Sequence, residues 1–254
     1  MPPKPPPDVR GWRWLWSRSL DLLFPPVCAV CERNLTLGRA LCDDCDNQLP
    51  RLAEPFCQQC GEAFPGEIDG RFSCPNCSNL RFSFEFARPA MLRDPSTLSM
   101  IHRLKYNREI HLAKELGRLA AGAFQDPRLA RARAESWPLV PVPLHRRRFQ
   151  HRHFNQAEEI ARELSRFTGL PVVKALLRIR RTETQTALSR AQRMENLKGA
   201  FAVSRAGGRL LSCQAAGAVL IDDVLTTGST VNECAKTLRH AGWKHVQVVT
   251  VMRG

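Results

Sequence analysis

The stretch that decides the fold is Ala218-Val219-Leu220-Ile221-Asp222-Asp223-Val224-Leu225-Thr226-Thr227-Gly228-Ser229-Thr230. Val219, Leu220 and Ile221 form a continuous apolar run, which is typical of a strand buried on both faces of a parallel sheet. A helical pattern follows from Val231 to Ala241 and ends at Gly242. The stretch therefore predicts a strand, a short loop, and a helix that begins where the loop ends.

The predicted loop has the composition of an anion-binding site. Hydroxyl donors are present at Thr226, Thr227, Ser229 and Thr230, and Gly228 permits close approach of a ligand to the backbone. The helix that follows adds unpaired backbone N–H groups and the positive end of its dipole. These features predict a site for a phosphate monoester. A P-loop nucleotide-binding protein would need a Gly-Lys-Thr or Gly-Lys-Ser element, which this loop lacks.

The whole string, two acids and then Thr-Thr-Gly-Ser-Thr after an apolar strand, resembles the motif with which type I phosphoribosyltransferases bind phosphoribosyl pyrophosphate (PRPP). The resemblance implies that Thr226 to Thr230 hold the 5-phosphate and that Asp222 and Asp223 are the catalytic acids, which meet the ribose hydroxyls. Their carboxylates would also favour positive charge developing at the anomeric carbon. A purely structural interpretation, with acids ending a strand and Thr-Thr-Gly capping a helix, explains single residues better than the string.

Three further segments resemble the ComF competence proteins. Val140 to Ala157 joins a Pro-Val-Pro strand to a basic turn, with His153 where the family has a glycine, a residue that tolerates positive φ more readily. Arg178 to Phe201 is a polar, basic segment suited to a lid that excludes water. Ile101 to Tyr106 resembles a Leu-Lys-Tyr element of the family. The residues expected to contact pyrophosphate or to form the lid are Lys105, Arg146, Arg152, Arg180, Thr184 and Gln185.

Eight of the ten cysteines fall in four C-x-x-C pairs. The two-residue spacer lets both thiolates point at one cation, and two pairs complete the four-sulfur shell that structural zinc prefers. Disulfides would suit a secreted chain, but no secretory signal is evident. We therefore predict two structural zinc ions. Sequential and cross-braced pairings have the same ligand count, and both stay open. The predicted ligands are Cys28, Cys31, Cys42, Cys45, Cys57, Cys60, Cys74 and Cys77, whereas Cys213 and Cys234 stand alone.

The chain has 254 residues and is 43% hydrophobic, which allows one substantial α/β core and a smaller module. We predict a disordered proline-rich tail and short amphipathic helix over residues 1–27, a zinc-binding module over 28–85 and a phosphoribosyltransferase-like domain over 86–254. Strand-like runs alternate with helical patterns in the last of these, which predicts a mostly parallel sheet flanked by helices. The strand-like runs lie near Val140, Val172, Phe201, Val219 and Val246, and the helical patterns around Glu115, Glu159, Glu195 and Glu233. The fold class is α/β, and the resemblance implies the type I phosphoribosyltransferase fold.

The chain is strongly basic, with 38 Lys and Arg against 24 Asp and Glu, a net charge of +14 and a pI near 9.9. Such a balance favours polyanionic partners. No run approaches the roughly 20 apolar residues that a transmembrane helix needs, and no secretory signal is evident, so we expect a cytoplasmic protein.

The ComF resemblance covers nearly the whole chain and implies a PRPP-binding protein associated with DNA uptake in natural transformation. Our first hypothesis is magnesium-dependent transfer of the phosphoribosyl group, with release of pyrophosphate, to an acceptor that no residue identifies. The alternative is a non-catalytic competence factor that binds single-stranded DNA and uses the PRPP pocket to sense a ligand, which the net charge and the zinc knuckles favour. DNA-uptake proteins are then expected partners.

Overall fold

The computed structural model describes residues 26–35, 38–68, 70, 72–78, 80–180, 190–212 and 216–254. Residues 1–25, Thr184, Gln185 and Cys213, on which sequence-based predictions fall, lie outside the described residues. Contacts within the chain define two compact units, residues 1–48 and residues 49–254. The first unit contains the short helix α2 (Asp43–Gln48), and the second contains the remaining described elements.

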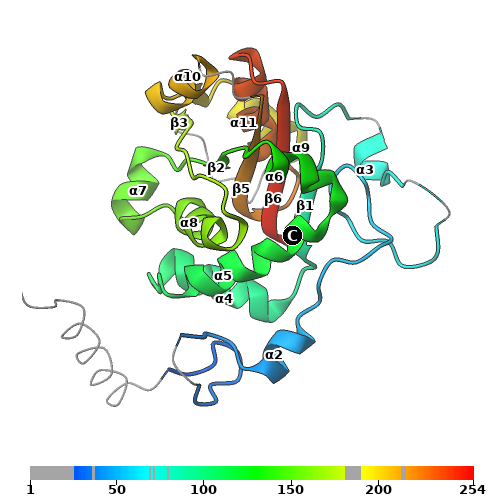
Figure 1. The fold of residues 1–254 in the computed structure, drawn as a ribbon, viewed down its shortest axis with the longest axis vertical. Coiled ribbons are helices and arrows are strands. Elements are labelled where there is room, and N and C mark those ends of the chain that lie inside the picture. Colours follow the sequence, from blue (N-terminus) through cyan, green and yellow to red (C-terminus); the bar gives the residue numbers. More distant parts are fainter. Residues whose placement is uncertain are drawn as a thin grey trace, which may run out of the picture. The chain divides into compact units, whose positions relative to one another are not determined.

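A four-stranded sheet forms the centre of the second unit (Figure 1). Its order is β1-β6-β5-β2, and each neighbouring pair is parallel. The strands are β1 (Ala87–Met91), β2 (Leu139–Pro141), β5 (Gly217–Leu225) and β6 (His245–Arg253). Most side chains of β5 and β6 are buried, as parallel strands covered on both faces require.

Helices cover the sheet. α5 (Leu112–Ala121) and α8 (Gln156–Thr168) pack together and contact the sheet. α11 (Ser229–His240) contacts β5 and β6, and its buried side chains share a core cluster with Ala218 and Leu220. The other helical elements are α3 (Pro75–Ser78), α4 (Pro95–Tyr106), η1 (Gly122–Gln125), η2 (Pro127–Leu129), α6 (Ala130–Ala134), α7 (Arg146–Arg152), α9 (Arg190–Leu197) and α10 (Arg205–Ser212). Within the described ranges, no helix has both the length and the apolar character that crossing a membrane demands.

Local sequence explains where the main helices begin and how they pack. Asp94 caps α4 by accepting a hydrogen bond from the Thr97 backbone N–H at 2.8 Å, and Asn155 caps α8 in the same way. Gly117 lets α5 and α8 approach, because a Cβ atom at this position would lie 2.5 Å from Cβ of Glu163. The caps set where α4 and α8 begin, and the small residue lets α5 and α8 pack closely.

The structure confirms most of the predicted elements. Val140, Val219 and Val246 lie in β2, β5 and β6, and the four predicted helical centres lie in α5, α8, α9 and α11. Phe201 begins β4 (Phe201–Val203), but this strand pairs antiparallel with β3 (Leu176–Arg178) in a separate two-stranded sheet. Val172 forms only an isolated bridge to Leu139. The sequence does not predict β1, because Ala-Arg-Pro-Ala-Met lacks an apolar run and proline is confined to edge strands such as this one.

Candidate functional site

Residues 226–228 connect the C-terminal end of β5 to the N-terminus of α11, as the sequence predicts. β5 continues to Leu225, so Asp222 and Asp223 lie in the last part of the strand rather than after it. Gly228 is the N-cap of α11 and has φ +76°, a left-handed conformation that favours glycine. The first helical residue is Ser229, two residues before the expected start at Val231.

Hydroxyl groups of the loop lie at the start of α11, where the first turn of N–H groups has no intrahelical acceptor. The hydroxyl oxygens of Thr227 and Ser229 are 2.9 Å apart, and the Ser229 backbone N–H donates to Thr227 Oγ1 at 3.4 Å. Thr226 is exposed, whereas Ser229 is buried. A small hollow at this place is lined by Asp222, Val224 and residues 225–231. The geometry suits a small anion held by hydroxyl and N–H donors.

The two adjacent aspartates have different surroundings, because successive side chains of a strand point to opposite faces. Asp223 is 3% exposed, accepts a hydrogen bond from Gln156 Nε2 at 3.2 Å and forms an ion pair with Lys105. Asp222 is partly exposed, lines the hollow at the loop and accepts a hydrogen bond from the Asp223 backbone N–H at 3.0 Å.

These surroundings shift the pKa values of the two carboxyl groups in opposite directions. Burial, and then the charge of Asp223, raise the pKa of Asp222 well above 3.8. Burial also acts to raise the pKa of Asp223, but Lys105, and then hydrogen bonds with the Asp222 side chain and the Gln156 amide, outweigh it, and that pKa is lowered. The arrangement therefore makes Asp223 the more acidic of the two groups, and Asp222 holds its proton more strongly.

The predicted basic residues differ in their distance from these acids. Lys105, in α4, contacts Asp223 directly. Arg152, at the end of α7, lies over the Tyr106 ring and donates to Gln156 Oε1 at 3.0 Å, so it is linked to Asp223 through that amide. Arg146 is exposed at the start of α7. Arg180 is also exposed, and its guanidinium donates to the Asn196 carbonyl at 2.9 Å.

Sequence reasoning assigned no role to Gln156, which contacts Asp223, or to Arg178, whose pKa is affected by the charge of Asp222. Gln156 is 6% exposed and connects Arg152 to Asp223. Arg178 ends β3 over the Phe201 ring, and burial, followed by the charge of Arg148, lowers its pKa while the charge of Asp222 opposes this shift. Gln156 could have been found from its place in the Phe-Asn-Gln end of the basic turn. No comparable sequence motif distinguishes Arg178 from the many other arginines of the chain.

The cysteines form two sequential tetrads, which resolves the pairing left open by the sequence. The four sulfur atoms of Cys28, Cys31, Cys42 and Cys45 lie within 4.8 Å of one another, as do those of Cys57, Cys60, Cys74 and Cys77. The Sγ atoms of Cys31 and Cys42 are 3.7 Å apart, and so are those of Cys60 and Cys74. Tetrahedral zinc with bonds of about 2.3 Å places sulfur atoms about 3.8 Å apart, so both tetrads fit structural zinc.

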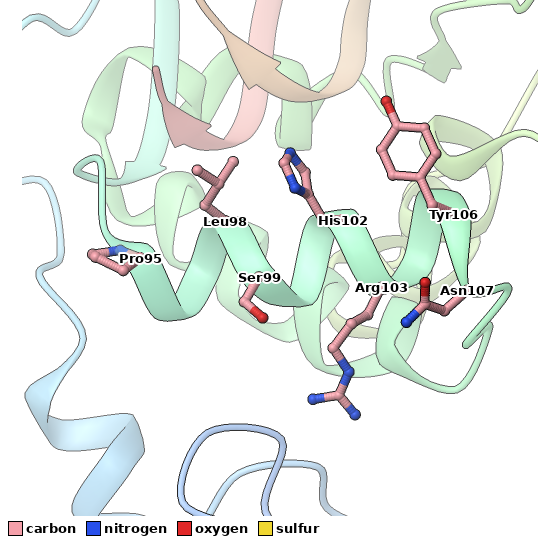
Figure 2. Close-up of a pocket in the computed structure, with 7 residues that line it drawn as sticks. All are labelled: Pro95, Leu98, Ser99, His102, Arg103, Tyr106 and Asn107. Carbon is pink, nitrogen blue, oxygen red and sulfur yellow. The ribbon is translucent and has the colours of Figure 1, made fainter.

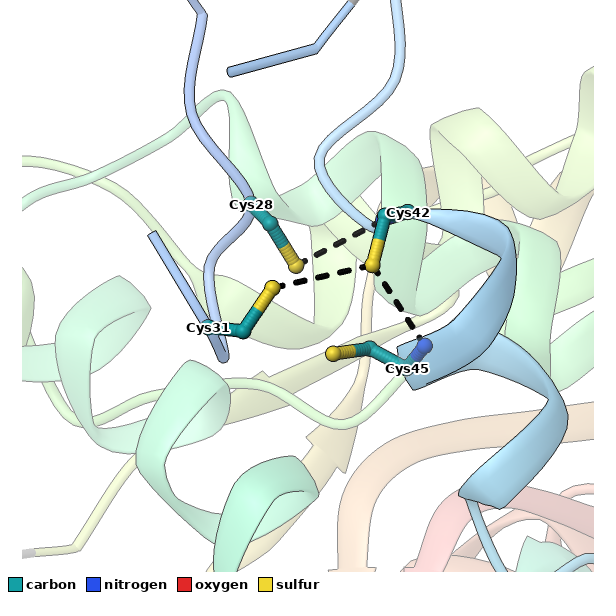
Figure 3. Close-up of side chains that lie close together, drawn as sticks. All are labelled: Cys28, Cys31, Cys42 and Cys45. Carbon is teal, nitrogen blue, oxygen red and sulfur yellow. Dashed lines mark hydrogen bonds between the residues drawn. The ribbon is translucent and has the colours of Figure 1, made fainter. Parts of the chain in front are cut away.

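Backbone donors support thiolate ligands in both tetrads. In the first, the N–H groups of Cys42 and Cys45 donate to the sulfur atoms of Cys28 and Cys42, each at 3.4 Å (Figure 3). In the second, the Cys74 N–H donates to Cys57 Sγ at 3.3 Å. Hydrogen bonds from the Cys60 side chain and from backbone N–H groups lower the pKa of the Cys57 thiol to about 4, although burial opposes this.

A separate hollow of about 500 Å³ lies along α4 (Figure 2). His102 and Tyr106 meet edge to face there, with ring centroids 5.7 Å apart, and Arg103 donates to Glu109 at 2.6 Å. It shares no lining residue with the loop hollow, and Lys105 on the same helix pairs with Asp223 instead. This hollow is therefore not part of the candidate site.

Over nearly its whole length, the chain is similar to proteins named for competence and for DNA utilization. The model of the double zinc ribbon domain matches residues 19–78. Competence protein F of Haemophilus influenzae is 30% identical over 224 residues, which are 87% of this chain and 94% of that protein. DNA utilization protein YhgH of Escherichia coli (strain K12) is 33% identical over 236 residues, 91% and 99% of the two chains.

A more distant relative, competence protein ComFC of Streptococcus pneumoniae, is 26% identical over 215 residues, 84% of this chain and 87% of that protein. The similarity extends from the zinc ribbon through the sheet that carries the loop, so it is not confined to the cysteine pattern. With two cysteine tetrads followed by an α/β unit built on a parallel sheet, the chain belongs to the competence protein F family.

Proposed function

We propose that this protein binds PRPP and transfers its phosphoribosyl group to an acceptor, with release of pyrophosphate. The observation that carries the proposal is the position of the Thr-Thr-Gly-Ser-Thr loop. It lies at the C-terminal end of a central parallel strand and at the N-terminus of α11, directly after two acids. Ligands of such sheets bind at the C-terminal ends of the strands.

In this proposal the residues of the site have separate roles. The hydroxyl and N–H groups of residues 226–230 hold the 5-phosphate. Asp222, which lines the loop hollow, meets the ribose hydroxyls. Asp223 holds Lys105 beside the site, where the ammonium group can stabilise the departing pyrophosphate.

Magnesium, when bound with PRPP, would neutralise the negative charge that develops on pyrophosphate. Asp223 is already paired with Lys105, so Asp222, which lines the loop hollow and whose pKa is raised by burial and by the charge of Asp223, is the carboxyl group left to meet this ion. The residues therefore suit an ion that arrives with the substrate rather than one held by protein carboxylates alone.

The test is calorimetric titration of the zinc-loaded protein with PRPP and magnesium. We expect the Asp222→Asn, Asp223→Asn variant to bind at least about tenfold more weakly, because it removes the carboxyl group that meets the ribose and the carboxylate that holds Lys105, and hydrogen bonds to charged groups contribute about 1.5–3 kcal/mol each. The matched control is Asp43→Asn, Asp44→Asn, which removes two adjacent exposed acids in α2. Absence of binding to folded wild-type protein would refute the proposal.

A second candidate function is binding of single-stranded DNA. α7 carries Arg146, Arg147 and Arg148, all exposed, and none of its residues is buried. A basic helix of this kind attracts phosphate backbones, and two relatives are named for competence and DNA utilization. Oligonucleotide binding that falls steeply with salt and is lost on replacing the three arginines with alanine, but unchanged in the Asp222→Asn, Asp223→Asn variant, would favour it.

A further inference from the structure

Arg253, the last residue of β6, binds the backbone at the start of the Thr-Thr-Gly-Ser-Thr loop. We call this loop, residues 226–230, the phosphate loop. Its Nη1 atom donates to the carbonyl oxygens of Leu225 at 2.6 Å and Thr226 at 2.8 Å. The same nitrogen donates to the Gly254 carbonyl at 2.7 Å, and the side chain is 11% exposed. These bonds fix the peptide groups through which β5 enters the loop, and with them the direction in which the following N–H groups point.

The other side of the same guanidinium contacts Glu62, which lies two residues after Cys60 of the second cysteine tetrad. Arg253 Nη2 forms an ion pair with Glu62. Glu62 closes the turn of the Cys57–Cys60 knuckle, because its carbonyl accepts a hydrogen bond from the Cys57 N–H at 2.7 Å. A continuous path of contacts therefore runs from the metal ligands through Glu62 and Arg253 to the carbonyl groups of the loop.

A second path joins the same tetrad to the loop through aromatic rings. Phe82 and Phe84 stack with centroids 4.7 Å apart, and a Cβ atom on Gly228 would lie 3.5 Å from Phe82 Cε1. The Ser83 N–H donates to Asn232 Oδ1 in α11 at 2.7 Å. Between ring, tetrad and loop lies a cavity of about 250 Å³, whose lining includes Cys60, Cys77, Phe82, Gly228 and Arg253.

The two tetrads differ in the part of the fold to which they belong. The four cysteines of the second belong to the same buried cluster as Leu220, Leu225 and Val231, which flank the loop. The first tetrad lies in the other compact unit of the chain. Since both tetrads fit zinc equally well, their difference lies in what surrounds them rather than in the ligands.

We infer that Arg253 is a positioning residue for the phosphate loop, and that the second zinc tetrad, through Glu62, fixes the position of Arg253. The inference rests on the proposed function, because it concerns the affinity of the same loop. A loop that is not held in its binding geometry must be ordered when the anion binds, and that cost lowers affinity without removing any direct contact.

The decisive variants are Glu62→Gln and Arg253→Lys. Glu62→Gln keeps the size of a partly exposed side chain and removes its charge. Arg253→Lys keeps the charge but loses the planar fork, in which one nitrogen reaches the loop carbonyl groups and the other reaches Glu62. The matched control is Asp44→Asn, which neutralises the partner of Arg33 beside the first tetrad. We expect both decisive variants to bind ribose 5-phosphate roughly three- to tenfold more weakly than wild type, with zinc content unchanged, and the control to bind normally.

A second readout does not depend on ligand binding. Amide hydrogen exchange in ligand-free protein should become faster at residues 225–230 in both variants and in Cys77→Ser, but not in Asp44→Asn or Cys45→Ser. Unchanged exchange in Glu62→Gln and Arg253→Lys would overturn the inference whatever the affinity. If wild type does not bind ribose 5-phosphate or PRPP, the proposed function fails, and exchange still decides whether Arg253 and the second tetrad order the loop.

Discussion

Asp222 and Asp223 are neighbours in sequence but, at the scale of single residues, they are not equivalent groups. Asp223 is ionised because Lys105 and Gln156 contact its carboxylate in a buried place. Asp222 is next to that charge and holds its proton more strongly. The sequence shows two acids, whereas the side-chain contacts decide which of them loses its proton more readily.

His153 has a backbone conformation that favours glycine, and we predict a measurable cost in stability. It is exposed, ends α7 and has φ +67°, a left-handed conformation that costs about 1–2 kcal/mol for residues other than glycine. His153→Gly should raise the free energy of unfolding by about 0.5–1 kcal/mol, because relief of strain exceeds the extra chain entropy of glycine, about 0.5–1 kcal/mol. Urea unfolding measures the change.

The matched position is Gly169, which ends α8 with φ +73° and faces open space where alanine would add its Cβ atom. Gly169→Ala should therefore lower the free energy of unfolding by about 1 kcal/mol through strain alone. A loss of stability in His153→Gly would show that the imidazole makes a contact that outweighs the strain.

At the scale of elements, the site is assembled where α4, α8 and the end of β5 meet. Lys105 comes from α4, Gln156 from the first turn of α8 and Asp223 from β5. The caps at Asp94 and Asn155 fix where the two helices start, and so which side chains reach the strand. Loop chemistry alone would not assemble these groups.

We predict that Lys105→Met lowers the free energy of unfolding at pH 7 by about 2–4 kcal/mol, because it leaves the buried Asp223 carboxylate without its cation. The double variant Lys105→Met, Asp223→Asn should recover about half of that loss, since no charge remains unpaired. Urea unfolding of both single variants and the double variant measures the coupling. Additive losses would show that the pair does not contribute.

The pH dependence of this effect follows from the lowered pKa of Asp223. A carboxyl group with a lowered folded-state pKa contributes stability above its unfolded pKa and loses that contribution as the pH falls through the folded value. The difference between wild type and Lys105→Met should therefore be largest near neutral pH and shrink as the pH falls towards 3.8 and below.

At the scale of the whole molecule, two chemically similar cysteine tetrads belong to different compact units. The second is part of the main core and the first is not. Removal of each zinc ion should therefore have a different consequence for stability, although the ligand sets are the same.

We predict that Cys77→Ser lowers the main thermal transition by about 6–12 °C, which corresponds to about 3 kcal/mol at 2–4 °C per kcal/mol in a chain of this size. Cys45→Ser should leave this transition within about 2 °C of wild type, because the first unit has its own contacts. Scanning calorimetry with zinc analysis of each variant measures both effects. Equal shifts in the two variants would contradict the division into units.

The sequence by itself determined the features that depend on residues close together in the chain. The strand, loop and helix of residues 217–240 are local, and so are the four C-x-x-C knuckles. The helical centres in α5, α8, α9 and α11 follow from periodicity within each segment. β1 escaped prediction because it is held by pairing with β6, not by its own composition.

Only the tertiary structure decided which distant residues meet. The sequential pairing of the tetrads, the contacts of Asp223 with Lys105 and Gln156, and the link from Glu62 through Arg253 to the loop join segments far apart in the chain. Sheet order places β6 beside β5, and so brings the last residues of both strands together. Such contacts form only when the whole core is buried. A local sequence pattern does not specify which distant segments will pair, because that choice depends on how all the elements pack together.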